Sequence, residues 1–151
     1  LELDGEHAVL RGSMDRVEID AQGHVHVVDF KTSRNAPGPR KIAEHAQLGI
    51  YQVAVEHGAV ASLGVEEARS GGAELVQLRT PAGAKDPDSP KVQSQAPPAP
   101  DEAFFALDLL AESARAVRDE RLVARPNDHC GFCDFRTLCP VLTGPTIGGA
   151  E

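Results

Sequence analysis

Two acidic residues and a lysine occupy strand positions where a half-buried sheet ordinarily has apolar side chains. Asp15 ends the run Gly-Ser-Met-Asp, and Asp29 and Lys31 lie in Val-Val-Asp-Phe-Lys-Thr. Two carboxylates can hold a hard divalent ion such as Mg²⁺, which prefers oxygen ligands and keeps several waters. The ion polarises a phosphoryl oxygen and activates a bound water, while a lysine stabilises developing negative charge. The three residues therefore suit metal-assisted phosphodiester hydrolysis, with the backbone carbonyl of Phe30 as a further metal ligand.

A β-hairpin is expected to position these side chains. Alternation predicts strands over residues 6–20 and 24–31, joined by a turn that ends at Gly23. A two-residue loop would split the apolar stripe between the two faces. A three-residue loop with a left-handed Gly23 keeps the stripe together and sets Asp15 opposite Asp29. Directly opposed side chains have Cβ atoms about 5 Å apart, so one ion could contact both carboxylates. An ordinary ion pair at a solvated strand end is the alternative interpretation.

A helix is expected to supply further polar groups beside the hairpin. Apolar residues recur at three and four residues over positions 40–57, and Gly58 follows as a stop. Gln47 and Tyr51 are four residues apart and share one face. Their alternative role is packing at the helix rim. The expected apolar stripe is Ile42, Ala46, Ile50, Val53 and Ala54.

The remaining segments are assigned from their composition. Turn formers predict a loop over 32–39, and alternation predicts a strand over 73–79. Residues 80–100 carry six prolines, in positions 81, 87, 90, 97, 98 and 100, and are expected to form an exposed, mobile loop. A helix is expected over 101–121 with Asp101 as its N-cap.

Charge and hydropathy restrict the class of protein. The net charge of −8 argues against broad nonspecific adhesion to nucleic acid, although basic residues outnumber acidic ones over residues 11–41. No apolar run approaches the length of a membrane span and no signal peptide is present, which indicates a cytoplasmic protein. The chain contains no phosphate-binding Gly-x4-Gly-Lys loop, so it is not itself an ATPase.

Three cysteines, Cys130, Cys133 and Cys139, lie close together near the C-terminus. In a reducing compartment such a group binds a metal or cluster rather than forming disulfides. Zinc and iron–sulfur are both candidates, and both require four ligands. His129 could complete a zinc site only if the backbone bends sharply. Three unliganded cysteines remain a further alternative.

The order of these motifs carries a family resemblance. It runs Gly12-x2-Asp15-Arg16, Asp29-Phe30-Lys31-Thr32, Gln47-x3-Tyr51 and Cys130-x2-Cys133-x5-Cys139-Pro140. Over residues 8–58 and 126–141 the chain resembles the RecB-type nucleases of the PD-(D/E)XK superfamily. It is most similar to the C-terminal nuclease domains of AddAB-type and AdnAB-type helicase–nucleases. CRISPR-associated RecB-like exonucleases share the motifs.

This resemblance implies a fold and an activity. The expected fold is α/β, a restriction-endonuclease-like mixed sheet flanked by helices, with a cysteine-ligated C-terminal appendage. The expected activity is that of a Mg²⁺-dependent or Mn²⁺-dependent DNA exonuclease within a helicase–nuclease for double-strand break repair. Its partners would be DNA, a helicase region and a second subunit. The alternative is a catalytically inactive nuclease-like domain that binds DNA or a partner.

The resemblance also implies residue roles. Asp15 and Asp29 would bind the metal, Lys31 would be catalytic, and Gln47, Tyr51 and Arg16 would contact DNA. Cys130, Cys133 and Cys139 would hold a [4Fe–4S] cluster together with a cysteine before Leu1, and zinc is the alternative. A helical histidine of the family would also precede Leu1, since the chain reads as a piece of a longer protein.

These roles suggest a division of the chain into three segments. We expect a nuclease core over 1–125, with the Pro-rich loop inside it, an iron–sulfur segment over 126–141 and a disordered tail over 142–151.

Overall fold

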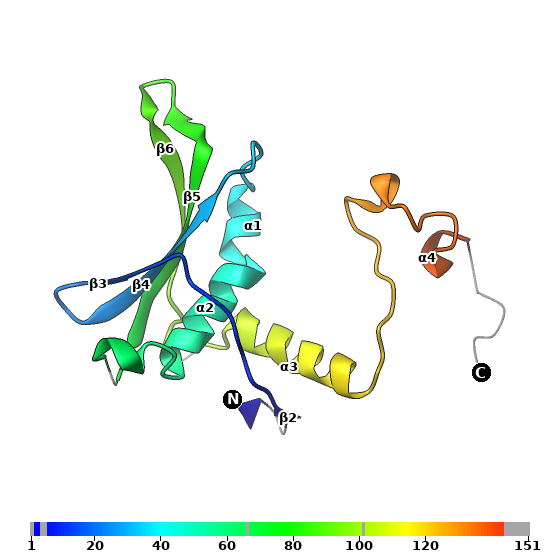
Figure 1. Ribbon diagram of the computed structural model, residues 1–151, viewed down its shortest axis with the longest axis horizontal. Coiled ribbons are helices and arrows are strands. Elements are labelled where there is room, and N and C mark those ends of the chain that lie inside the picture. The colour runs from blue at the N-terminus through cyan, green and yellow to red at the C-terminus, as the bar shows by residue number, and fades with distance from the viewer. Residues whose placement is uncertain (1, 4–5, 66, 101, 144–151) are drawn as a thin grey trace. The chain divides into compact units, whose positions relative to one another are not determined.

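The computed structural model describes residues 2–3, 6–65, 67–100 and 102–143, in two compact units, Leu1–Arg115 and Ala116–Glu151. The first unit contains a mixed four-stranded sheet in which only β4 and β5 run parallel (Figure 1). Helices flank the sheet, which confirms the predicted α/β class. The strands, in spatial order, are β3 (Arg16–Ile19), β4 (His24–Lys31), β5 (Arg69–Gly83) and β6 (Asp86–Gln95). A separate two-stranded ribbon, β1 (Glu2–Leu3) and β2 (Glu6–His7), precedes them.

The β3–β4 hairpin has the predicted register. Val17 lies opposite Val27, and Gly23 closes the turn with a φ of +86°. Such a positive φ is strained for residues with a Cβ atom, which explains the glycine. The strand predicted over 6–20 is wrong in its middle part, because residues 8–15 form no strand and pairing begins at Arg16. The predicted bounds of β4 are confirmed.

The single helix predicted over 40–57 is wrong. The chain forms α1 (Pro39–Ala43) and α2 (Ala46–Glu56), with a break at Glu44 and His45. The side-chain amide of Gln95, a buried residue of β6, donates to the carbonyl oxygens of Ile42 at 2.8 Å and His45 at 3.3 Å. The carbonyl oxygens of Ile42 and His45 also accept backbone N–H groups, from His45 and Gly49. The Gln95 amide additionally donates to the carbonyl oxygen of Ala43, the last residue of α1, at 3.2 Å. The long-range contact therefore stabilises the break.

Helix α2 packs on two sides, and for this reason the predicted apolar stripe is wrong. Leu48 and Val55 pack with Val25, Val27 and other residues of the sheet in the main core. Val53 and Ile50 instead pack against α3 (Phe105–Arg118). Of the predicted stripe, Ala46 is exposed, and Ile50 and Ala54 are only half-buried.

A glycine permits the close approach of α3 to α2. A Cβ atom at Gly49 would lie 2.7 Å from the ring of Phe105, which is shorter than real contacts. Helix α3 begins four residues later than predicted, and the predicted N-cap, Asp101, lies outside the described residues. A short 3-10 helix, η1 (Ala61–Leu63), follows α2 after Gly58.

The Pro-rich segment forms strands, so the loop predicted over 80–100 is wrong in this respect. Strand β5 continues to Gly83 and β6 returns from Asp86, and the two form a long hairpin (Figure 1). Strand β4 pairs with β5 only as far as Lys31 and Gln77. Beyond that point no strand of the described residues pairs with the outer edge of either β5 or β6. A proline whose missing N–H would face such an edge therefore leaves no carbonyl oxygen of a neighbouring strand without a hydrogen bond. Residues 81–90 are exposed, as the sequence indicates.

The second unit contains little regular structure. It includes the 3-10 helix η2 (Cys130–Phe132) and α4 (Pro140–Thr143). The tail predicted over 142–151 begins inside α4, and from residue 144 it lies outside the described residues. No helix in the described part of the chain has the length and apolar character to cross a membrane.

Candidate active site

The end of β4 places a carboxylate and an ammonium group side by side. Asp29 and Lys31 share a face of the strand, and Asp29 is only 2% exposed. Lys31 Nζ lies 2.7 Å from Asp29 Oδ2. The same ammonium donates a hydrogen bond of 2.8 Å to Gln47 Oε1 on α2. The strand and the helix are thus joined by a lysine that neutralises a buried carboxylate.

Gln47 and Tyr51 complete this group from α2. Gln47 Nε2 donates to Asp29 Oδ1 at 3.0 Å and to Tyr51 Oη at 2.8 Å. Tyr51 Oη donates to the same Asp29 oxygen at 3.3 Å. Four side chains that lie up to 22 residues apart therefore form one connected network around Asp29. We call Asp29, Lys31, Gln47 and Tyr51 the Asp29 cluster.

The side-chain carboxylate of Asp15 is hydrogen-bonded to the backbone at the same end of β4. Its Oδ2 accepts the N–H of Phe30 at 2.9 Å. In an antiparallel ladder every second residue exchanges backbone hydrogen bonds with its partner strand. In the register of β3 and β4, Phe30 is the next residue after Val28 whose N–H points towards β3. The Asp15 carboxylate takes this N–H, which explains why β3 begins only at Arg16. The strand pairing ends at Arg16 and Val28, one residue short of the predicted pairing of Asp15 with Asp29.

The pKa of Tyr51 lies above its ordinary value. Burial is the main cause that raises its pKa. The hydrogen bond from Gln47 acts in the opposite direction, while the negative charges of Asp29 and Asp15 raise the pKa further. Tyr51 therefore stays protonated at neutral pH and keeps its hydrogen-bond donor.

The donor set fits a Mg²⁺ ion whose shell is completed by water and a phosphate. Asp29 Oδ2 is buried and accepts no hydrogen bond of proper geometry, although Lys31 Nζ is close to it. Asp15 is an exposed carboxylate beside the same strand end. No group of three or more His, Cys, Asp or Glu side chains suited to a metal occurs in the described residues. Mg²⁺ is commonly bound by one or two carboxylates together with substrate phosphate, so Asp15 and Asp29 suffice.

A family model described as the PD-(D/E)XK nuclease superfamily matches residues 1–140. The chain belongs to this superfamily. Members of the PD-(D/E)XK superfamily are generally nucleases and commonly use divalent metals. The fold described above is consistent with the restriction-endonuclease-like core. No curated protein matches the chain.

His45 is a residue of this PD-(D/E)XK domain that the sequence interpretation missed. It is the N-cap of α2, and its Nδ1 is buried without a hydrogen-bond partner. Burial and then the positive charge of Lys31 lower its pKa, while the charge of Asp29 raises it. The charges of Lys31 and Asp29 therefore act on the protonation of His45. Its position two residues before Gln47 was the available signal, but a continuous helix over 40–57 concealed it.

Arg16, the third predicted DNA contact, forms a different interaction in the PD-(D/E)XK domain. Its guanidinium pairs with Glu18 on the same strand, and both side chains are largely exposed. No hydrogen bond or ion pair joins Arg16 to the Asp29 cluster in the described part of the chain. The DNA-binding roles of Arg16, Gln47 and Tyr51 stay predictions, as does the Phe30 carbonyl ligand.

The three cysteines do not form a metal-binding group in the described residues. No disulfide joins them, and Cys130 Sγ accepts the backbone N–H of Asn127 at 3.2 Å. Cys133 is exposed, and Cys130 and Cys139 are partly exposed. The geometry of the described residues therefore gives no support to a [4Fe–4S] cluster or to a zinc ion.

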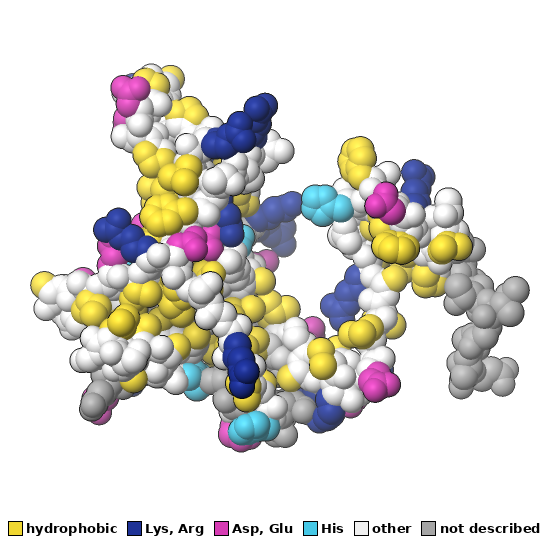
Figure 2. Space-filling model, viewed as in Figure 1, with side chains coloured by type: hydrophobic (Ala, Val, Ile, Leu, Met, Phe, Trp, Pro, Cys, Tyr) yellow, Lys and Arg dark blue, Asp and Glu magenta, His cyan; other side chains and the backbone are white. Residues whose placement is uncertain are grey.

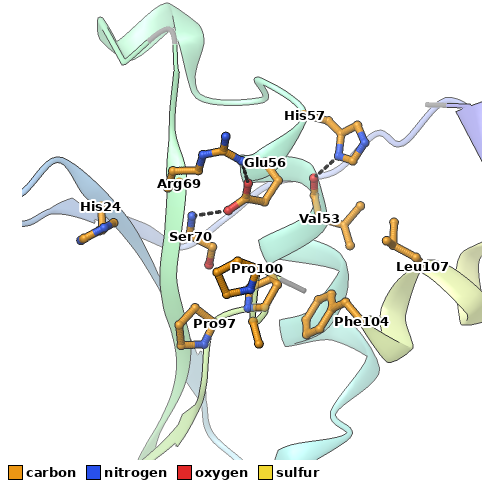
Figure 3. A pocket seen from close by; sticks show the side chains of 12 residues that line it. His24, Val53, Glu56, His57, Arg69, Ser70, Pro97, Pro100, Phe104 and Leu107 are labelled. Atoms are coloured by element: carbon orange, nitrogen blue, oxygen red, sulfur yellow. Dashed lines mark hydrogen bonds and ion pairs between the residues drawn. The ribbon is translucent and has the colours of Figure 1, made fainter. Parts of the chain in front are cut away.

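A hollow of the PD-(D/E)XK domain lies at the other end of α2 (Figure 3). It has a volume of about 720 Å³ and is lined by Pro97, Pro100, Phe104 and residues near the end of α2. Glu56 accepts hydrogen bonds there from Arg69 and from the backbone of Ser70 (Figure 3). No residue of the Asp29 cluster lines it. The candidate chemistry therefore lies on an open strand end rather than in this cavity.

Proposed function

We propose that this PD-(D/E)XK domain is a metal-dependent deoxyribonuclease that removes nucleotides from DNA ends. The observation that carries the proposal is the Asp29 cluster. A buried carboxylate is costly unless its charge is compensated, and here one oxygen of Asp29 lacks a hydrogen bond while Lys31 stands beside it. Buried charges of this kind are typical of sites that bind a metal or a charged substrate.

The residues of the cluster have separate roles in the proposed reaction. Asp15 and Asp29 would hold Mg²⁺ or Mn²⁺, which when bound supplies Lewis-acid polarisation of the phosphate and an activated water. Lys31, held by Gln47 beside Asp29, stabilises negative charge that develops on the phosphate. Gln47 and Tyr51 fix the orientation of Asp29. The single O–H of Tyr51 is donated to Asp29, so a hydrogen bond from Tyr51 to DNA would replace this bond.

The order of the motifs supports a proposal for the cellular role. The succession of Asp15, Asp29, Lys31, Gln47 and Tyr51, followed by three cysteines, resembles the RecB-like domains of helicase–nucleases. We therefore propose a cytoplasmic role in double-strand break repair, with a helicase region and a second subunit as partners. The [4Fe–4S] assignment is kept only as a hypothesis from the cysteine spacing, with zinc as the alternative.

Comparison of linear and circular DNA tests the proposal. Purified protein is incubated with end-labelled linear duplex and with covalently closed circular DNA, in Mg²⁺, in Mn²⁺ and in EDTA. We expect nucleotides to be released from the linear ends only, and only with metal. Cleavage of the circle would contradict the exonuclease assignment. DNA binding without cleavage in any metal would favour the alternative, a nuclease-like domain that only binds.

A further inference from the structure

The segment after the Asp29 cluster is purely basic in an acidic chain. Residues 30–43, which run from the end of β4 through α1, contain Lys31, Arg34, Arg40 and Lys41 and no aspartate or glutamate. The whole chain has a net charge of −8. Lys31 is paired with Asp29, so the other three basic residues, Arg34, Arg40 and Lys41, form the local excess of positive charge beside the proposed phosphodiester site.

Hydrogen bonds hold this segment against the β5–β6 hairpin. Gln93 Nε2 donates to the carbonyl oxygen of Pro37 at 2.7 Å. Thr80 Oγ1 donates to the carbonyl oxygen of Arg34 at 3.4 Å. Near the site, Ser33 Oγ lies 3.4 Å from Gln77 Oε1, and Gln77 is the strand partner of Lys31. The loop is thus attached at three places along its length, and its basic side chains project from a fixed backbone.

Two arginines of this segment are exposed and have no acidic partner. Arg34 and Arg40 form no ion pair among the described residues, whereas Arg16 and Arg69 pair with Glu18 and Glu56. Figure 2 shows dark-blue side chains beside the hairpin, where the loop between β4 and α1 lies. Unpaired guanidinium groups are well suited to phosphate, which they bind in a fork geometry.

We propose that residues 32–41 form a track for the DNA phosphate backbone, with Arg34 and Arg40 as its contacts. This inference rests on the proposed nuclease function, because the track begins at Lys31 and leads away from the Asp29 cluster. An acidic peptide could also bind guanidinium groups. DNA is favoured because the track is continuous with a site that suits a phosphodiester, and because phosphate contacts need no sequence-specific partner.

The salt dependence of DNA binding tests the track. Affinity for a single-stranded and a duplex oligonucleotide is measured in EDTA, where metal-dependent cleavage cannot occur, across a series of salt concentrations. The double variant Arg34→Gln/Arg40→Gln is compared with Arg69→Gln, which removes an exposed arginine. Arg69 is eight residues before Gln77 on β5, or roughly 26 Å along the strand.

We expect the slope of log affinity against log salt to fall by about 0.7–0.9 for each arginine removed. This corresponds to roughly a tenfold loss of affinity per arginine at about 50 mM salt. In Mg²⁺, KM for DNA should rise while kcat at saturating DNA stays unchanged. The variant Arg34→Lys/Arg40→Lys keeps the charge and should retain most of the slope. Arg69→Gln should match the wild type.

Several results would overturn the track. One such result is a salt slope and an affinity for the double glutamine variant equal to those of the wild type, with thermal unfolding also unchanged. Arg69→Gln could lower the slope equally, which would show a general effect of charge. Tighter binding of an acidic peptide than of DNA would identify the other partner. A protein that never cleaves DNA but shows the expected slope change would refute the proposed nuclease function and leave the track intact.

Discussion

Asp29 and Lys31 depend on each other for their stability. The carboxylate is 2% exposed, and the nearest cation is Lys31 at 2.7 Å. Removal of one partner of a buried pair leaves an uncompensated charge, and this costs more than the intact pair contributes. The same imbalance makes the pair useful, since a metal ion can replace the ammonium as the partner of Asp29.

A double-mutant cycle tests this dependence. Lys31→Met should lower the free energy of unfolding by about 2 kcal/mol, less than for a fully buried pair because the lysine is partly exposed. Adding Asp29→Asn should recover most of this loss, since the amide retains the bonds to Gln47 and Tyr51 without a charge. Denaturant unfolding without metal measures all four proteins. Additive effects would show that the two residues are not coupled.

Among the elements, the break between α1 and α2 is maintained by Gln95. Its amide donates to carbonyl oxygens at the break, and its Oε1 accepts Gln52 Nε2 at 2.8 Å. Gln52 in turn accepts the hydroxyl of Ser70 at 2.9 Å. These buried side chains link β5, β6 and α2, and they set the point at which α2 begins.

Gln95→Leu should therefore destabilise the fold. The leucine leaves the side-chain amide of Gln52 buried without a partner and removes the bonds that Gln95 donates to the carbonyl oxygens at the break, which costs about 2–3 kcal/mol. Thermal or denaturant unfolding measures the change. Gln22→Leu on the exposed hairpin turn is the matched control and should have little effect. Equal stability of the Gln95 variant and the wild type would show that the network does not support the break.

The turn of the β3–β4 hairpin should be sensitive to acid. Partial desolvation raises the pKa of Asp20, but hydrogen bonds from the His24 N–H, the His26 ring and the Gln22 N–H outweigh it and lower the pKa from 3.8 to about 2. Because the pKa is lower in the folded state, the charged carboxylate stabilises the hairpin above pH 3.8, and this contribution is lost as the pH falls towards 2.

Replacement of Asp20 should remove this part of the pH dependence. In Asp20→Ala the free energy of unfolding should fall less steeply than in the wild type as the pH drops through this range, because the unfolded state no longer takes up the additional proton. Denaturant unfolding at a series of pH values measures both proteins. Parallel curves for the two proteins would contradict the assignment.

At the scale of the whole molecule, local signals predicted the hairpin register and the shared helix face of Gln47 and Tyr51, while long-range contacts determined the elements that were predicted wrongly. Gly23 and the alternation around it were enough to predict the β3–β4 register. The spacing of Gln47 and Tyr51 was enough to place them on one face, which their hydrogen bond bears out. Both depend only on neighbours in sequence.

The errors have a common physical cause. The helix break depends on Gln95, which is about 50 residues away in sequence, so local periodicity could not reveal it. The Pro-rich strands are stable because they lie beyond the end of β4, where an unbonded edge tolerates proline. The burial of Gln52 on α2 likewise depends on partners that are distant in sequence, Ser70 on β5 and Gln95 on β6.

Cleavage by Asp29→Asn is the most direct measurement of the central account. Cleavage of linear DNA in Mg²⁺ is compared for the wild type, Asp29→Asn and Asp20→Asn, which makes the same substitution at the hairpin turn. We expect Asp29→Asn to remain folded and bind DNA but to cleave at least about 100-fold more slowly, while Asp20→Asn cleaves normally at neutral pH. Wild-type cleavage by Asp29→Asn would contradict the account.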